Sequence, residues 1–169
     1  MGDLTNTEFA AVLLVFRVVF GLVFAAHGVA KRKGGIDGTA GWFDSLGMRP
    51  GRLHAQLASL TEIVSGLLLA LGFLTSFAAA AVVGVMVVAG YTVHRKEGFF
   101  IVKNGWEYTF MVSLMAVLIA GVGPGDWSVD AGIDLADTLN GWVGLAIAVG
   151  VGVVGGVGQI VAFYRPPAD

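Results

Sequence analysis

Five stretches of mainly apolar residues dominate this chain, and each is long enough to cross a lipid bilayer. They cover about 9–29, 54–74, 77–95, 105–123 and 141–163. A membrane-spanning helix needs about 20 such residues, each adding about 1.5 Å. The sequence therefore predicts an all-α, polytopic membrane protein with a single membrane domain. We expect the first four stretches to form a four-helix transmembrane bundle, and the glycine-rich fifth to be an additional transmembrane helix.

The composition agrees with this fold class and excludes several kinds of site. Of the 169 residues, 56% are hydrophobic and 13% are charged, whereas soluble domains carry about 25% charged residues. The net charge of −2 gives no general attraction to nucleic acid. The chain has no cysteine, which excludes thiolate catalysis, iron–sulfur clusters and cysteine-based zinc sites. Any redox role therefore requires a bound cofactor, a quinone or a partner protein.

Basic residues fall on one side of the membrane if the five spans alternate in direction. That side holds nine basic residues: Lys31, Arg32, Lys33, Arg49, Arg52, Arg95, Lys96, Lys103 and Arg165. The opposite side holds none, and its loop at 124–140 carries four aspartates, which we interpret as a solvated acidic turn. Because basic loops stay inside the cell, we expect the N-terminus outside and the C-terminus in the cytoplasm. Residues 40–48 predict a short helix on the cytoplasmic membrane surface.

Ionisable residues occur within the apolar stretches or at their ends: Arg17, His27, Glu62, His94 and Glu107. A charge near the centre of a spanning helix costs about 2.5–3.5 kcal/mol on insertion scales, so such residues face a bundle interior and mark a site. In the predicted orientation they gather in the cytoplasmic half of the bundle. At 100° per residue, Tyr91 shares a helix face with His94. We expect these six residues to line a polar cavity suited to proton-coupled chemistry or to a polar head group.

Structural roles compete with this interpretation for each residue taken alone. Arg17 and Glu62 could form an ion pair that only joins two helices. The two histidines could donate to carbonyl groups at helix ends, and Glu107 could complement the dipole of a helix N-terminus. Histidine and glutamate are conceivable metal ligands, but no local ligand spacing is present, so no metal is predicted. No phosphate-binding loop and no Ser-His-Asp arrangement is visible, so the chain is not expected to be an enzyme on its own.

The fifth stretch has small residues at every fourth position: Gly144, Ala148, Gly152 and Gly156. Such a face allows close helix contact within a membrane. We expect this helix to pack against its own bundle or against a partner, either another copy of the chain or a different membrane protein.

Several short motifs contain the same polar residues and occur in a fixed order over about 9–132. They are His27-Gly28, Glu62 with Gly66-Leu67-Leu68-Leu69, His94 with Gly98-Phe99-Phe100, Asn104-Gly105-Trp106-Glu107-Tyr108 and Gly123-Pro124-Gly125. In these motifs the chain resembles the DoxX family of small bacterial membrane proteins. The resemblance implies a four-helix bundle in the bacterial inner membrane and an association with quinone-linked oxidoreductases. Some members of that family are linked to a membrane complex that handles oxidative stress.

Two hypotheses of different classes follow. In the first, the chain is a subunit of a redox or oxidative-stress complex that binds an amphipathic ligand such as a quinone. Glu62 and His94 would then bind the head group or relay protons, with Arg17 keeping Glu62 charged and with Glu107 and His27 connecting the site to the cytoplasm. In the second, the chain is a non-enzymatic accessory subunit, its ion pairs are structural, and the Gly144–Gly156 face docks a larger complex. A small-solute or proton pathway is a third and weaker interpretation, because no inverted internal repeat is visible.

Overall fold

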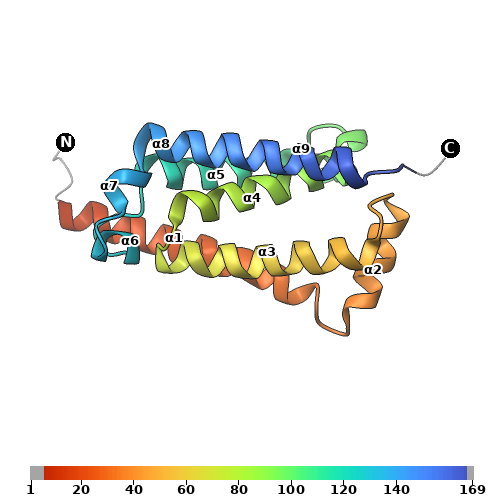
Figure 1. Cartoon of the computed structure of the whole chain (residues 1–169), viewed down its shortest axis with the longest axis horizontal. Coiled ribbons are helices and arrows are strands. Elements are labelled where there is room, and N and C mark those ends of the chain that lie inside the picture. Colours follow the sequence, from red (N-terminus) through yellow and green to blue (C-terminus); the bar gives the residue numbers. More distant parts are fainter. Residues whose placement is uncertain (1–5, 167–169) are drawn as a thin grey trace.

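The computed structural model describes residues 6–166, and its long helices lie side by side in two layers along the long axis of the molecule (Figure 1). The first layer pairs α1 (Asn6–Ala30) with α3 (Gly51–Leu71). The second layer contains α4 (Thr75–Ala89), α5 (Glu107–Val122) and one continuous helix formed by α8 (Gly141–Ala146), the π-helical turn η4 (Ile147–Val151) and α9 (Gly152–Phe163). Contacts between α3 and α4 join the two layers.

Among the described residues, four helical segments are long and apolar enough to cross a membrane. They are Asn6–Ala30, Gly51–Leu71, Thr75–Glu97 and Gly141–Phe163. This confirms the predicted all-α, polytopic membrane fold. The stretch at 105–123 forms the shorter helix α5 of 16 residues. At 1.5 Å per residue α5 is about 24 Å long, against about 30 Å for a hydrocarbon core.

Small residues bring α1 and α3 into direct backbone contact. A side chain added at Gly21 would collide with the backbone of Gly66, and one added at Gly28 would collide with the backbone of Ser59. The Ser59 hydroxyl donates a hydrogen bond of 3.0 Å to the Gly28 carbonyl across this contact. The two helices run antiparallel, so residues near 28 on α1 lie level with residues near 61 on α3.

The glycine face of the fifth span is used inside the bundle. A side chain added at Gly152 or Gly156 would collide with backbone atoms of α4, and one at Gly144 would meet the backbone of α5. Ala148 on the same face is fully buried. Of the two expected uses of this face, packing within the chain is therefore the one that occurs. Gly144, Ala148, Gly152 and Gly156 are not free to dock a partner, and that expectation is corrected.

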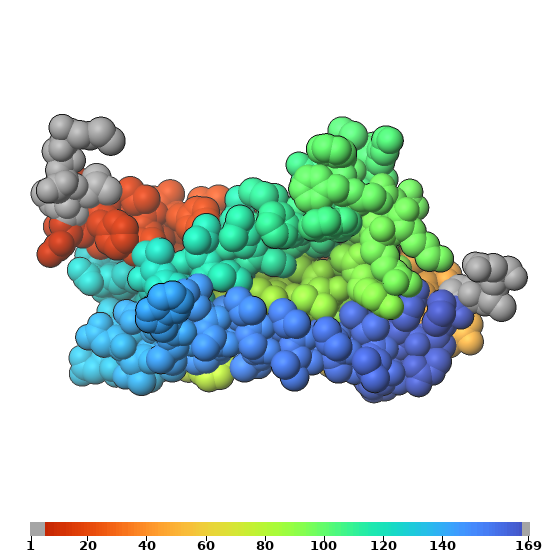
Figure 2. All heavy atoms as spheres, turned by 90° about the horizontal axis from the view of Figure 1, so that it is seen from above, coloured from red at the N-terminus to blue at the C-terminus, as the bar shows by residue number. Residues whose placement is uncertain are grey.

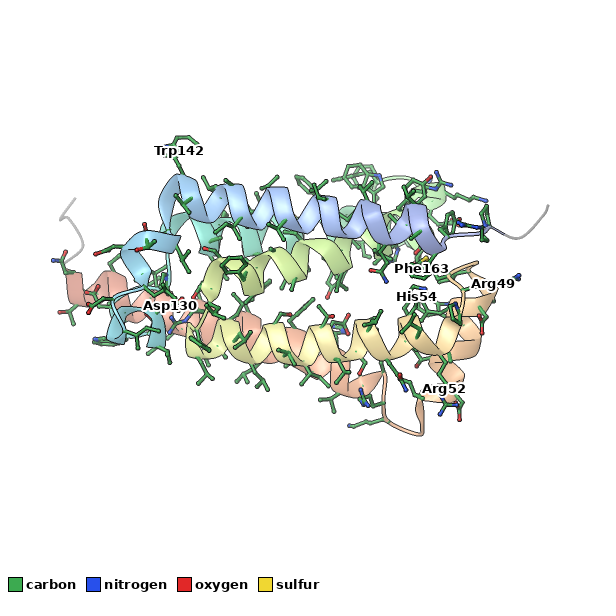
Figure 3. All side chains as sticks on the ribbon, viewed as in Figure 1. Arg49, Arg52, His54, Asp130, Trp142 and Phe163 are labelled. Atoms are coloured by element: carbon green, nitrogen blue, oxygen red, sulfur yellow. The ribbon has the colours of Figure 1, made fainter. Side chains whose placement is uncertain are left out.

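The two ends of the bundle differ in charge. One end, hereafter the basic end, holds α2 (Ile36–Ser45), the π-helical turn η1 (Gly90–His94), the 3₁₀ turns η2 (Arg95–Glu97) and η3 (Ile101–Lys103), and the end of α9. The other, the acidic end, holds the short helices α6 (Val129–Gly132) and α7 (Ala136–Leu139). Figure 3 places Arg49 and Arg52 at the first end and Asp130 at the second. The distribution agrees with the charge pattern on which the predicted orientation rests, and the orientation itself stays a prediction.

The segments at the basic end cover the bundle in different ways. The helix expected at 40–48 runs from Ile36 to Ser45, and it buries Ala40 and Phe43 against α3. The segment at 95–106 rises from the bundle above the end of α4 (Figure 2). An isolated β-bridge joins Met48 to Tyr164 and ties the loop after α2 to the end of α9.

Candidate functional site

A pocket of about 200 Å³ lies toward the basic end of the bundle, between the two layers. Apolar side chains such as Phe24, Val85 and Met86 form much of its wall. Its polar lining comes from five helical segments and the turn after α1: His27, Lys31, Thr61, Glu62, Thr92, His94, Tyr108, Thr109 and Gln159. A mostly apolar pocket with a few convergent polar groups is the usual form of a small-molecule site.

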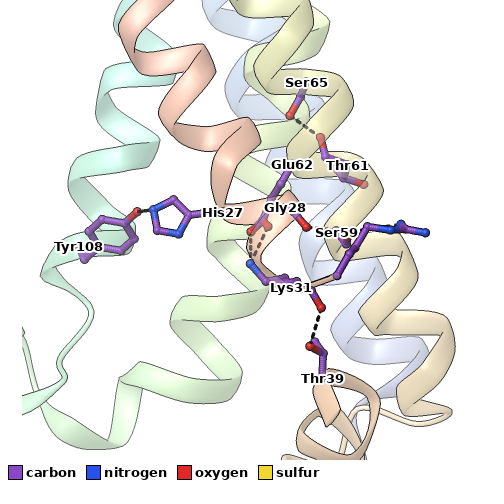
Figure 4. Close-up of polar contacts among 10 residues, drawn as sticks. His27, Gly28, Lys31, Thr39, Ser59, Thr61, Glu62, Ser65 and Tyr108 are labelled. Atoms are coloured by element: carbon purple, nitrogen blue, oxygen red, sulfur yellow. Dashed lines mark hydrogen bonds and ion pairs between the residues drawn. The ribbon is translucent and has the colours of Figure 1, made fainter. Parts of the chain in front are cut away.

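The central feature of the pocket is an ion pair between Glu62 on α3 and Lys31 just after α1 (Figure 4). The Lys31 ammonium donates to both carboxylate oxygens, at 2.7 Å to Oε1 and 2.6 Å to Oε2. Glu62 is only 3% exposed. The close contact between α1 and α3 at Gly28 and Ser59 brings the two residues to the same level. Among the described residues, Lys31 is the basic side chain that forms an ion pair with the Glu62 carboxylate.

A second polar pair forms one edge of the pocket. The Tyr108 hydroxyl of α5 lies 3.3 Å from Nε2 of His27 on α1, and the two side chains point toward each other (Figure 4). Both residues line the pocket and are also exposed on the outer surface of the bundle. The pocket therefore reaches the surface of the bundle at this pair.

His94 and Gln159 reach the pocket from the second layer. The Nδ1 atom of His94 lies 2.7 Å from the Asn104 carbonyl oxygen, and Nε2 has no hydrogen bond to another described residue. The Gln159 amide of α9 lies 2.9 Å from Nδ1 of His54, a fully buried residue of α3. His54 is held in turn between the rings of Phe43 and Phe163. This contact fixes the amide of Gln159 beside the pocket.

Arg17 is not part of this site, and its expected pairing with Glu62 is wrong. Its guanidinium lies at the acidic end, where Nη1 donates to the Pro124 carbonyl at 2.7 Å and Nη2 donates to the Trp127 carbonyl at 2.8 Å. It also packs against Gly72, ten residues beyond Glu62 on α3, a separation of about 15 Å along the helix. Arg17 thus ties the loop after α5 to the end of α3.

Asp130 performs a related structural task beside Arg17. Its carboxylate accepts hydrogen bonds from the backbone N–H of Leu74 and of Thr75, at 2.8 and 2.9 Å, and one from the Thr75 hydroxyl at 2.8 Å. The backbone N–H groups at the start of α4 have no acceptor within that helix. Asp130 accepts their hydrogen bonds and so caps α4, although it lies more than 50 residues later in the chain. The buried charges at the acidic end therefore organise loops.

Tyr91 and Glu107 also lie outside the pocket. Tyr91 is 40% exposed, and its ring packs edge-on against the ring of Tyr164, with 5.7 Å between the two centroids. The Arg95 guanidinium lies 4.0 Å from the centroid of the Tyr91 ring. The Glu107 carboxylate accepts a hydrogen bond of 2.9 Å from the Ile101 backbone N–H and so closes the loop before α5. Of the six expected residues, the structure brings together His27, Glu62 and His94.

The sequence interpretation left several polar residues out of the site: Lys31, Tyr108 and Gln159 line the pocket, as do Thr61, Thr92 and Thr109. It also left out His54, which contacts Gln159. Lys31 was assigned to a basic loop, although its position four residues after His27 places it on the same helix face. Gln159 is the only residue with a side-chain amide in the fifth stretch. A polar side chain in an apolar helix indicates a polar site, and the sequence interpretation did not use this signal. No group of three or more His, Asp or Glu side chains converges in a metal-binding arrangement within residues 6–166.

Comparisons with known proteins agree with the expected family. The DoxX family model matches residues 12–95. "Uncharacterized membrane protein Rv3486" of Mycobacterium tuberculosis is 29% identical over 139 residues, which are 75% of this chain and 84% of that protein. "Putative oxidoreductase CatD" of Bacillus subtilis is 27% identical over 118 residues, covering 70% of this chain and 84% of that protein. No solved structure matches significantly.

Proposed function

As a member of the DoxX family the chain is a multi-pass membrane protein, and we propose that it takes part in membrane redox chemistry by binding a quinone in the pocket around Glu62. The observation that carries this proposal is the ion pair of the buried Glu62 with the partly exposed Lys31, at the wall of a pocket that reaches the bundle surface at His27 and Tyr108. Burying the Glu62 carboxylate costs several kcal/mol, and an apolar side chain of equal volume would serve packing at least as well. We therefore infer that this ion pair at the wall of a cavity serves to bind a ligand rather than to stabilise the fold.

The size and lining of the pocket suit a ring-sized head group with an apolar tail. A volume of about 200 Å³ lies below the 300–1,000 Å³ typical of sites that enclose a whole drug-sized ligand. The ring would enter past His27 and Tyr108, and the tail would stay between α1 and α5 or in the bilayer. Phe24, Val85 and Met86 would contact the ring faces.

Four polar side chains would orient the head group. Quinone carbonyl oxygens accept hydrogen bonds, and Lys31, Tyr108 and the His94 imidazole are donors on different walls of the pocket. Gln159 adds an amide that His54 holds in place. A bound quinone supplies two-electron chemistry coupled to proton uptake at its oxygens. Glu62 and His27 would hold and transfer those protons, because both are titratable and both lie at the pocket.

The electrons have to come from another protein. The chain has no cysteine for an iron–sulfur cluster or a redox-active disulfide. We therefore place it as a subunit of a redox or oxidative-stress complex in the bacterial inner membrane, with the basic end in the cytoplasm. The printed name of the Bacillus subtilis relative, an oxidoreductase, supports this class of function.

The test is to measure the organic molecules that leave the membrane with the protein. The wild type and a Glu62→Gln variant are purified from native membranes in mild detergent, and their organic extracts are quantified by mass spectrometry. Arg52→Gln is the matched control, because it breaks the exposed pair with Asp37 at the same end of the bundle. We expect near-stoichiometric quinone in the wild type and the control, and a loss of about tenfold or more in Glu62→Gln, as expected when a charge-assisted contact is removed.

The accessory-subunit hypothesis predicts a different result. Arg17 and Asp130 demonstrate that buried charges in this bundle also serve purely structural ends. If neither the wild type nor the control carries a quinone, the Glu62–Lys31 pair belongs to the same structural class. In that case Glu62→Gln would change the unfolding temperature alone.

A further inference from the structure

A second hollow lies on the outer surface of the bundle, between α4 and α5 at the basic end. This groove has a volume of about 390 Å³. Met86 and Val87 of α4 and Gly90 of the π-helical turn η1 form one side of it. Trp106, Thr109, Phe110 and Ser113 form the other wall. Thr109 and Met86 also line the quinone pocket from its inner side, so the two hollows are separated by the α4–α5 contact.

The groove offers an apolar surface along its length. The Thr109 hydroxyl donates to the Trp106 carbonyl and the Ser113 hydroxyl donates to the Thr109 carbonyl, each at 2.8 Å. Both hydroxyl protons are therefore already used within α5. The remaining wall consists of aromatic, aliphatic and thioether groups, so an occupant of the groove gains by being apolar.

A cation stands at the cytoplasmic mouth of this groove. Arg95 lines it and lies 4.0 Å above the Tyr91 ring, which holds the guanidinium in place. Within residues 6–166 the ion pairs are Lys31–Glu62 and Arg52–Asp37, so Arg95 has no carboxylate partner there. Glu107, the nearest acid on α5, is engaged by the Ile101 backbone N–H. The same projecting segment also carries Lys96, Glu97 and Lys103, which do not line the groove.

We propose that this groove binds one anionic phospholipid, with an acyl chain between α4 and α5 and the phosphate on Arg95. An apolar channel that ends at an unpaired guanidinium fits an anionic lipid better than a zwitterionic one, because the cationic group of a zwitterionic head group opposes the guanidinium. Arginine binds phosphate in a bidentate manner, and basic sites between transmembrane helices on the cytoplasmic side attract acidic head groups. The proposal stands apart from the quinone site, because it uses the outer wall of α4 and α5.

The test compares lipids that differ only in the charge of the head group. Detergent-purified protein is titrated with phosphatidylglycerol and with phosphatidylcholine of the same acyl chains, and bound lipid is counted by native mass spectrometry. The variants are Arg95→Gln, which removes the phosphate contact, and Ser113→Phe, which fills the groove. Lys103→Gln is the control, since it removes a positive charge from the same segment outside the groove.

We expect the wild type and Lys103→Gln to retain one phosphatidylglycerol with about tenfold preference over phosphatidylcholine, and Arg95→Gln to lose that preference. The Ser113→Phe variant keeps the Arg95 guanidinium, but we expect it to lose bound phosphatidylglycerol because the new side chain fills the groove. Equal retention of the two lipids by the wild type, or an unchanged preference in Arg95→Gln, would overturn the proposal. Glycerol phosphate that competes as well as the intact lipid would overturn it too, since the groove would then have no part in binding.

Discussion

Glu62 and Arg17 are both buried charged residues of the same bundle, but one lies at a pocket and the other joins loops. Glu62 lies at a cavity and has one cation, Lys31, as its partner. Arg17 lies among backbone carbonyls and contacts no cavity of the basic end. Helix periodicity correctly places both residues on inward faces. It does not give the register between α1 and α3, which sets them about 15 Å apart along the axis.

The register explains which site residues could be predicted. The small residues Gly21, Gly28 and Gly66 indicate close approach, but their pairing across α1 and α3 appears only in three dimensions. With that pairing known, Glu62 falls level with His27 and Lys31. His94 reaches the same pocket because α4 ends in a π-helical turn, a local widening that the sequence pattern does not reveal. Tyr91, on the expected face of the same turn, points to the outer groove instead.

Replacement of Arg17 should affect stability and leave the ligand in place. Arg17→Leu removes two hydrogen bonds at the acidic end and leaves the carbonyl groups of Pro124 and Trp127 without their donor. We expect a loss of about 3–5 kcal/mol in the free energy of unfolding, as for other broken buried charge contacts. Thermal unfolding measures this loss, and extraction of the folded fraction should recover the wild-type amount of quinone per chain. A selective loss of quinone at unchanged stability would return Arg17 to the site.

At the scale of helices, hydropathy predicted the elements well and their exact extents less well. Each expected apolar stretch contains a helix, but the one at 105–123 begins only at Glu107, because the preceding residues form a closed loop held by its carboxylate. The fifth stretch packs on α4 through glycines rather than reaching outward. Periodicity identified that face, and only the structure identifies what it faces.

A pair of glycine variants tests the role of the fifth helix. Gly156→Leu places a side chain against the backbone of Gly84 and the side chain of Val87, whereas the neighbouring Gly155 has open space around it. We expect Gly156→Leu to cost about 1–3 kcal/mol through overpacking and Gly155→Leu to be nearly neutral. Thermal unfolding in detergent distinguishes the two. Equal stability of both variants, with release of a co-purifying protein by Gly156→Leu, would mean that the face belongs to a partner.

At the scale of the whole molecule, charge is divided along the long axis. Basic residues occur in and near α2, in η2 and after α9, and four aspartates occur in the segment that holds α6 and α7. Figure 3 labels Arg49 and Arg52 at one end of the bundle and Asp130 at the other. The predicted orientation, with the basic end inside the cell, rests on this division. Both proposed binding sites lie toward that end, the quinone pocket between the layers and the lipid groove on the outer face. The half of the bundle at the basic end is thus the part in which we expect ligands and partners to meet.

The most direct test of the central claim is a binding titration with a short-tailed quinone. Trp42 lines the pocket, so a bound quinone ring should quench its fluorescence. Ligand-depleted wild type should give a saturable decrease with one site per chain, lost in Glu62→Gln and kept in Arg52→Gln. A Trp42→Phe variant identifies the part of the signal that comes from the pocket. Quenching that rises linearly without saturation, and equally in wild type and Glu62→Gln, would contradict the proposal that this pocket binds a quinone.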